Sequence, residues 1–154
     1  MTLKYKNILV AVDGSKESEL AFKKGAGAAK RNNATLHLAH IIDNRSFGSI
    51  EAYDRTIADR TRKTSEELLA KYKEEALAAG VENVNVIIEY GTPKVFIPKE
   101  LAPKLNVDVI VCGATGLNAA ERFILGSVSE RIVRTAKCDV LVVRRDQADV
   151  LADE

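Results

Sequence analysis

The chain has 154 residues, about the length of one domain, and its composition of 46% apolar and 29% charged residues is that of an ordinary globular protein. Its 23 basic and 22 acidic side chains nearly cancel, which excludes binding to nucleic acid through phosphate neutralisation alone. No apolar run approaches the roughly 20 residues that cross a bilayer, and the two cysteines exclude a disulfide scaffold. We therefore expect a cytoplasmic protein with one domain over residues 1–145 and an acidic tail over 146–154.

Five short apolar runs predict β-strands. They are residues 8–12, 35–42, 84–89, 107–112 and 140–143. The first run and the last two are almost continuously apolar, which is typical of strands buried on both faces of a parallel sheet. Helical segments separate the runs, and this alternation predicts an α/β fold with right-handed crossovers and helices on both faces of the sheet.

The first helix is predicted over residues 15–31, with Ser15 as its N-cap. Gly25 and Gly27 weaken this helix by roughly 1 kcal/mol each relative to alanine. Their missing side chains would let the helix lie close to the sheet. A second, longer helix is predicted over 51–79.

Gly80 supplies a stop for that second helix. The next crossover contains all three prolines of the chain, Pro93, Pro98 and Pro103. Because proline removes a backbone donor from a helix interior, we expect a short or kinked helix there. A last helix is predicted over 128–136.

Ligands of open α/β sheets bind outside the carboxyl ends of the strands, and two such ends carry suitable chemistry. At the first, Asp13 follows a buried strand, where its carboxylate could accept hydrogen bonds from ribose hydroxyls. It could equally cap the following helix through backbone N–H groups. From this stretch alone, ribose binding and helix capping are equally supported roles for Asp13.

The second end is that of the fourth strand, where Gly113 and Gly116 precede Gly126 and Ser127 at the start of a helix. Glycines let backbone N–H groups approach phosphate oxygens, and a helix start offers unpaired donors at the positive end of its dipole. The hydroxyls of Ser127 and Ser129 add two more donors. This chemistry suits a phosphate group.

A helix cap is the alternative interpretation of the same residues. The run from Ser127 to Glu130 fits the capping box S-x-x-E, which needs no ligand, and a capping box alone would favour this alternative. The usual nucleotide fingerprints are absent as well. The chain has no G-x-x-x-x-G-K-[ST], and the pair Gly25 and Gly27 lies within a helix and lacks the third glycine of a Rossmann site.

The spacing of Gly113, Gly116, Gly126 and Ser127 reads G-x2-G-x9-G-[ST]. In this the chain resembles the ATP-binding branch of the universal stress protein family, whose signature it matches without a gap. Three further segments resemble the same family: residues 8–15, 36–40 and 138–144. The resemblance implies a flavodoxin-like sheet of five parallel strands in the order 3-2-1-4-5, with a site between the first and fourth strands.

The resemblance also implies ATP as the ligand, with Mg²⁺ or Mn²⁺ held mainly by phosphate and water. Adenine would lie beside Ala11, Val12 and Ile41, and Asp13 would hold the ribose. The phosphates would lie against the glycine-rich stretch and the start of the last helix, formed by Gly113, Thr115, Gly116, Gly126, Ser127, Val128 and Ser129. Thr115 stands where many members of the family have arginine or histidine.

By the same resemblance the protein would form a homodimer through its last strand, made of Val140, Leu141, Val142 and Val143, because an apolar edge strand invites pairing. Its function would be that of a nucleotide-dependent switch or binding module in the stress response. One alternative is a slow ATPase or autokinase, although the signature offers Arg122 as its only cation and no evident base. Another is a structural dimerisation module without nucleotide. The charged stretch 54–63 is either a solvated face or part of a lid.

The remaining candidates have simpler interpretations. His37 and His40 are three residues apart on a predicted strand, so their side chains point to opposite faces and we expect packing residues rather than metal ligands. Cys112 and Cys138 border predicted strands and are expected to behave as small hydrophobic residues.

Overall fold

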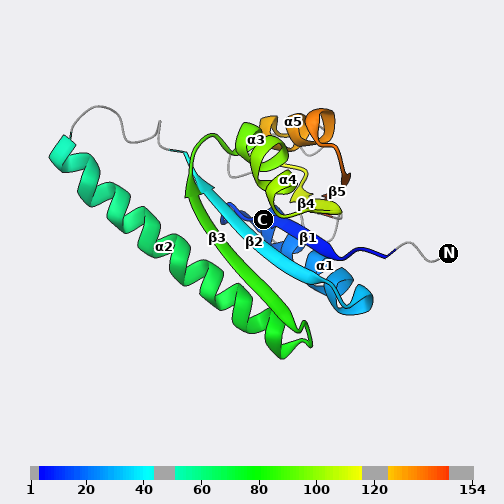
Figure 1. Cartoon of the computed structure of the whole chain (residues 1–154). Helices are drawn as coiled ribbons and strands as arrows, with labels where there is room; N and C mark the ends of the chain where they lie inside the picture. The colour runs from blue at the N-terminus through cyan, green and yellow to red at the C-terminus, as the bar shows by residue number, and fades with distance from the viewer. Residues whose placement is uncertain (1–3, 44–50, 116–124, 146–154) are drawn as a thin grey trace.

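The computed structural model describes residues 4–43, 51–115 and 125–145, and the backbone alone for 51–54. It contains one parallel sheet of order β3-β2-β1-β4-β5, which confirms the predicted fold and strand order (Figure 1). The strands are β1 (Asn7–Ala11), β2 (Thr35–Ile42), β3 (Asn83–Tyr90), β4 (Val109–Gly113) and β5 (Asp139–Val143). The helices are α1 (Lys16–Asn32), α2 (Glu51–Ala78), α3 (Pro93–Phe96), the π-helix η2 (Ile97–Leu101), α4 (Ala102–Lys104) and α5 (Ser127–Thr135). The predicted tail, 146–154, lies outside the described residues.

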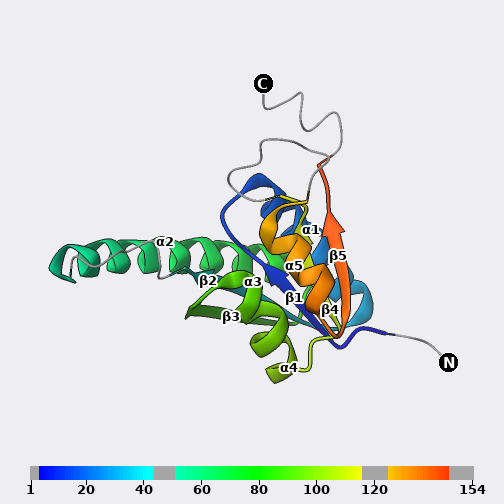
Figure 2. The same cartoon turned by 90° about the horizontal axis from the view of Figure 1, so that it is seen from above.

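Helices cover both faces of the sheet (Figure 2). On one face, Val10 and Leu38 belong to a core cluster that includes residues of α1 and α2. On the other, Leu9 and Ile110 belong to a second cluster with residues of η2 and α5. Successive residues of a strand point to opposite faces, so the central strands are buried on both sides, as their continuous apolar runs predict.

Helix α1 begins as predicted, because the Ser15 hydroxyl accepts a hydrogen bond from the N–H of Ser18 at 3.1 Å. Gly25 allows the close approach to the sheet, since a Cβ there would lie 2.5 Å from Cγ2 of Val10. Gly27 has no such role, because its Cβ would meet only the flexible guanidinium of Arg31, at 3.2 Å. The prediction for the glycines is therefore confirmed at one position of the two.

Helix α2 has 28 residues, and Gly80 follows its end with a φ of 108°. Leu69 and Tyr72 are buried against the sheet, and the Tyr72 ring stacks on Phe22 of α1 with the centroids 4.3 Å apart. Farther toward its start, Ile57 is 39% exposed, and Figures 1 and 2 show this part of α2 projecting past the end of the sheet. In the described parts of the chain, no helix is both long and apolar enough to cross a membrane.

The proline segment forms the kinked helix that was predicted. Pro98 and Pro103 have no N–H, so the regular hydrogen-bond ladder is interrupted there. The N–H of Ala102 bonds to the carbonyl of Ile97, five residues back, which defines the π-helical turn between α3 and α4. The segment packs against the face of the sheet that also holds α5.

Candidate functional site

The carboxyl ends of β1 and β2 lie side by side. Pairing continues one residue beyond β1, because the N–H of Val12 donates to the carbonyl of Ala39 at 2.8 Å. Val12 and Ile41 are buried, and Ala11 is partly buried against the core cluster that contains Leu9 and Ile110. The structure thus brings together Ala11, Val12 and Ile41, the predicted surroundings of the base.

Asp13 lies exposed at this edge, just beyond the end of β1. One of its carboxylate oxygens, Oδ1, accepts the N–H of Ser15 at 2.9 Å and so shapes the turn that leads into α1. The cap of the helix is Ser15, and Asp13 supports the start of α1 through one backbone N–H without being its cap. An exposed carboxylate is left at the edge where ligands of such sheets bind.

Gly113 ends β4 and touches the start of α1. A Cβ at this position would lie 2.6 Å from Cβ of Glu17 and 2.9 Å from its backbone carbon. Real Cβ atoms do not approach backbone so closely, so the first glycine of the signature is required by packing whether or not a ligand binds. The close contact also brings the first turn of α1 onto the end of β4.

Helix α5 starts at the end of β4 as well. Gly126 is its N-cap, and the N–H of Gly126 donates to the carbonyl of Ala114 at 2.7 Å. The buried hydroxyl of Ser129 donates to the same carbonyl, at 2.8 Å. These two bonds fix the start of α5, and they commit the Ser129 hydroxyl, so only its backbone N–H could face a ligand.

The capping box is not formed. Among the described side chains none caps α5, and the carboxylate of Glu130 pairs with Arg134 at 3.3 Å instead of reaching back to the start of the helix. The first backbone bond of α5 runs from the N–H of Glu130 to the carbonyl of Gly126, at 2.9 Å. Within the described residues, the N–H groups of Ser127, Val128 and Ser129 therefore have no partner.

Such unpaired N–H groups at the positive end of a nine-residue helix can bind an anion.

The remaining residues predicted to hold the phosphates are less informative. Thr115 is partly buried at the limit of the described chain, and Gly116 lies outside the described residues, as does Arg122. The structure therefore places most of the predicted phosphate residues at one edge, close to the end of β4.

Two residues at this edge were missed by the sequence predictions as site residues. Arg145 follows β5 and pairs with Glu17 of α1 at 3.7 Å, with side chains only 16% and 12% exposed. His40 of β2 is half-buried, and its Nδ1 is inaccessible to solvent and makes no hydrogen bond to the part of the chain that the structure describes. Burial lowers the pKa of His40, and the negative charge of Asp13 acts in the opposite direction. The only hint in the sequence is that His40 directly precedes Ile41.

The cysteines are not set up as nucleophiles. Cys112 is buried at the end of β4, and burial raises the pKa of its thiol to about 12. Burial, reinforced by Asp139, also raises the pKa of Cys138. Both thiols are thus kept protonated, in agreement with their prediction as small hydrophobic residues.

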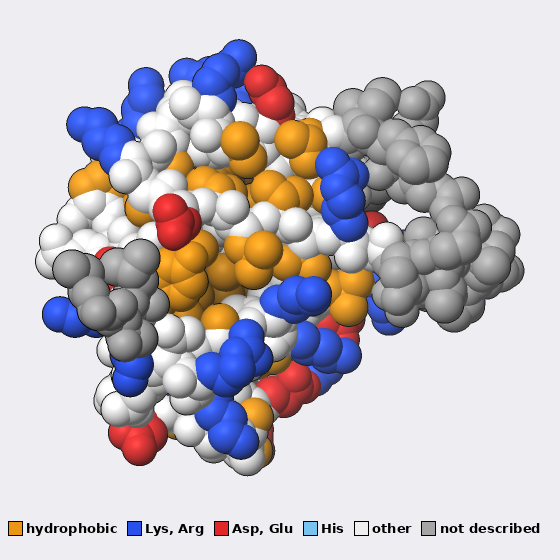
Figure 3. Space-filling view, turned by 90° about the vertical axis from the view of Figure 1, so that its right-hand side faces the viewer, with side chains coloured by type: hydrophobic (Ala, Val, Ile, Leu, Met, Phe, Trp, Pro, Cys, Tyr) orange, Lys and Arg blue, Asp and Glu red, His pale blue; other side chains and the backbone are white. Residues whose placement is uncertain are grey.

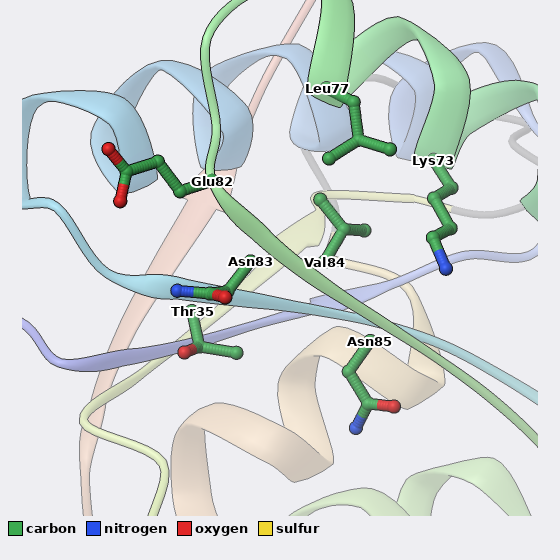
Figure 4. A pocket seen from close by; sticks show the side chains of 7 residues that line it. All are labelled: Thr35, Lys73, Leu77, Glu82, Asn83, Val84 and Asn85. Atoms are coloured by element: carbon green, nitrogen blue, oxygen red, sulfur yellow. The ribbon is translucent and has the colours of Figure 1, made fainter.

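A surface hollow of about 420 Å³ lies at the other end of the sheet (Figure 4). Seven residues line it: Thr35, Lys73, Leu77, Glu82, Asn83, Val84 and Asn85. Figure 4 shows Leu77 and Val84 on one side of β3 and Thr35 and Asn85 on the other, so the hollow wraps around an edge strand. It lies at the start of β2 and β3, away from Asp13, and we do not assign it to the ligand.

The β5 edge, predicted to form a dimer, carries exposed apolar side chains. Leu141 is 42% exposed, and Val133 of the neighbouring α5 is 48% exposed. Figure 3 shows the corresponding face, where hydrophobic side chains gather in the middle with lysine and arginine around them. An open parallel edge with such a surface is suited to pairing with another strand.

Comparisons with known proteins agree with this geometry. The sequence profile of the universal stress protein family matches residues 4–144. A universal stress protein of Staphylococcus haemolyticus is 57% identical over 145 residues, covering 94% of this chain and 88% of its own length.

Two solved structures have the same fold. The universal stress protein UspA from Lactobacillus plantarum has a TM-score of 0.86 at 28% identity, covering 93% of this chain and 100% of its own. A universal stress protein in complex with cAMP has a TM-score of 0.71 at 27% identity, covering 92% and 98%.

Proposed function

This chain belongs to the universal stress protein family, and from that premise we propose that it binds ATP and acts as a nucleotide-dependent switch or binding module in the stress response. A cytoplasmic location is part of this proposal. The site would be the carboxyl edge of the sheet, between β1 and β4.

One observation carries the proposal: the unpartnered N–H groups of Ser127, Val128 and Ser129 share an edge of the sheet with the exposed carboxylate of Asp13. The N–H groups suit phosphate oxygens, and the carboxylate suits ribose hydroxyls. A polar ligand with both features is a nucleotide. The relative in complex with cAMP supports an adenine nucleotide, since cAMP contains an adenine, a ribose and a phosphate.

Mg²⁺ or Mn²⁺ would accompany ATP and be held through its phosphates and water. Over the described ranges, no group of three or more His, Cys, Asp or Glu side chains is arranged to hold a metal ion. A cation coordinated mainly by the ligand fits that arrangement, because Mg²⁺ usually keeps several waters and binds substrate phosphates.

Binding is proposed in preference to rapid turnover. Efficient phosphoryl transfer needs a positioned base and a cationic clamp on the phosphates. The exposed side chains of Glu130 and Arg134 on α5 pair with each other, and the largely buried Arg145 pairs with Glu17, so each of these two arginines already has a carboxylate partner.

A proline at the first position of α5 tests the phosphate contact. Ser127→Pro removes one N–H where a helix tolerates proline best, and Gly126, with φ −66° and ψ 161°, already has the conformation that precedes proline. Calorimetry with Mg-ATP should show about tenfold or greater loss of affinity, as expected when a charge-assisted hydrogen bond is lost. Ser127→Ala, which keeps the N–H and removes only the hydroxyl, is the matched control and should lose less affinity than Ser127→Pro. Equal affinity of all three proteins would place the phosphates elsewhere, and no binding by the wild type would reject the proposal.

The homodimer through β5 is the second part of the proposal. Leu141→Lys puts a charge on the exposed apolar edge and should convert a dimer to a monomer in analytical ultracentrifugation. Leu77→Lys is the matched control, because Leu77 is 46% exposed on α2, away from β5. A dimer that persists in the Leu141 variant would exclude β5 as the interface.

A further inference from the structure

His40 is an ionisable group at this edge that has no role in the proposed function. It is half-buried, and its Nδ1 atom has no contact with solvent and no hydrogen-bond partner among the described residues. Buried ring nitrogens in native structures are usually paired, so an unpaired one calls for an explanation. The other histidine shows the usual arrangement, because both ring nitrogens of His37 are hydrogen-bonded, to Asn7 and Asn85.

The strand register places His40 beside the proposed ribose contact. Ala11 pairs with Ala39, and the N–H of Val12 donates to the carbonyl of Ala39, so His40 directly follows the last residue of β2 that pairs with β1, and Asp13 lies two residues beyond the last paired residue of β1. His40 and Asp13 thus share the carboxyl end of two neighbouring strands, where the backbone is proposed to flank adenine, and the charge of Asp13 reaches the ring.

We propose that His40 is a proton-binding residue coupled to the nucleotide site, so that an anionic nucleotide binds together with a proton. This inference rests on the proposed function and adds a dependence on pH to it. The ring does not touch the ligand in this proposal. The positive charge of the protonated ring instead attracts the anionic nucleotide from the carboxyl end of β2.

β2 packs against β1, β3, α1, α2 and α3. Ionisable residues on these elements and next to the carboxyl end of β2 include Asp13 after β1, Asp43 after β2, Glu17 and Glu19 of α1, Arg62, Glu66 and Tyr72 of α2, Glu89 and Tyr90 of β3, and Lys94 of α3. Asp13 is the one whose charge perturbs His40 among the described residues. Arg62 and Glu66 pair with each other at 3.1 Å, and Glu17 pairs with Arg145.

The sign of the coupling follows from electrostatics. Burial holds the pKa of His40 below 6.5, so the ring is neutral at pH 7 in the free protein. Phosphate groups bound at the start of α5 add negative charge at the same edge of the sheet, with β1 between β2 and β4, and so favour the protonated form of the ring. By linkage, nucleotide binding takes up a proton, and affinity rises as the pH falls through the pKa that His40 has in the complex.

The coupling to Asp13 is tested first without nucleotide, on the full chain. The sequence contains two histidines, so a pH titration followed by NMR resolves each ring. Asp13→Asn should lower the pKa of His40 and leave that of His37 unchanged. An unmoved His40 in that variant would overturn the proposal.

The coupling to the ligand is tested by calorimetry with Mg-ATP at pH 7.5 and pH 5.8, in buffers of different ionisation enthalpy. Wild-type protein should bind with proton uptake at the lower pH and gain about threefold more affinity than His40→Gln does over the same range. His37→Gln, which keeps His40, should behave as the wild type. The free nucleotide titrates in the same way in every experiment. The difference in proton uptake between the wild type and His40→Gln therefore measures the contribution of His40.

Adenosine is the uncharged probe and should bind with little proton uptake. Proton uptake by His40→Gln equal to that of the wild type would overturn the inference and leave the proposed function standing. Absence of Mg-ATP binding at either pH would instead reject the proposed function, and this inference with it.

Discussion

The two ends of the sheet differ in how completely their polar groups are paired. At the amino end, Asp108 accepts the N–H groups of Lys6 and Asn7 at 2.7 and 2.8 Å, and the side chains of Asn7, His37 and Asn85 form a continuous hydrogen-bonded row. At the carboxyl end, Nδ1 of His40 and the first N–H groups of α5 lack partners within the described chain. Both ends belong to the same five strands.

The difference separates groups that stabilise the fold from groups left available to a ligand. An unpaired buried polar group costs about 1–3 kcal/mol, so a fold keeps one at a cost in stability. Variants at the amino end should therefore change the free energy of unfolding and not ligand affinity. Variants that remove donors at the carboxyl end should change ligand affinity and leave the free energy of unfolding unchanged.

Gly113 is the position where this separation should fail, and the largest effect is expected there. Gly113→Ala places a Cβ 2.9 Å from the backbone carbon of Glu17, which must shift. Overpacking of this kind costs about 1–3 kcal/mol, and displacing the first turn of α1 should also weaken Mg-ATP binding, since Asp13 precedes that turn. Urea unfolding and calorimetry on the same samples measure both effects.

Gly27→Ala is the matched control for that substitution. Its Cβ would meet only the end of the Arg31 side chain, and alanine is the better helix former, so the free energy of unfolding should rise by about 0.5–1 kcal/mol. Should Gly113→Ala prove as stable as the wild type, the contact with Glu17 would not be what requires glycine in the signature.

Asp108→Ala tests the paired end. It removes the acceptor of two backbone N–H groups, one of them partly buried, and should lower the free energy of unfolding by about 1–2 kcal/mol. Mg-ATP affinity should stay within error of the wild type, because Asp108 lies at the opposite end of the sheet from Asp13. A weakened affinity at unchanged stability would show that the two ends are not independent.

The smallest effect expected is a dependence of stability on pH that arises from His37. Burial lowers its pKa below 6.5, and the ring donates from Nε2 to Asn7 and accepts at Nδ1 from Asn85, a pattern that only the neutral ring can make. The folded protein thus binds fewer protons than the unfolded chain. The free energy of unfolding should fall as the pH drops below about 6.5 and level off below the folded pKa.

Urea midpoints at pH 7.5, 6.5 and 5.5 measure this dependence. His40 contributes in the same direction in the free protein, because burial lowers its pKa as well. The His37→Gln variant should keep the pH dependence that arises from His40 and lose the pH dependence that arises from His37. A midpoint that rises toward acid pH would contradict both assignments.

The architecture was predictable because the pattern of apolar residues repeats the periods of the elements. The predicted strand at 35–42 has the bounds of β2, and Ser15 and Gly80 mark helix ends as expected. The fourth strand starts two residues later than predicted, at Val109, because the N–H of Val107 closes the preceding helical segment by donating to Ala102.

The site was predictable in its residues and less so in their roles. Ser127 fits a capping box in the sequence, yet the carbonyl of Ala114 holds Gly126 and Ser129 and thereby moves the cap to Gly126. The packing role of Gly113 depends on a helix that begins nearly 100 positions earlier in the chain. Long-range contacts of this kind have no local signature, and the same holds for the unpaired nitrogen of His40.

The length of α2 has a consequence for local stability. A helix of 28 residues spans about 42 Å, whereas the eight residues of β3 span about 26 Å. One helix therefore has an anchored portion around Leu69 and Tyr72 and a portion around Ile57 with little beneath it. Amide hydrogen exchange should be slow in the first portion and fast in the second, so α2 should open from its start while the rest of the helix stays folded.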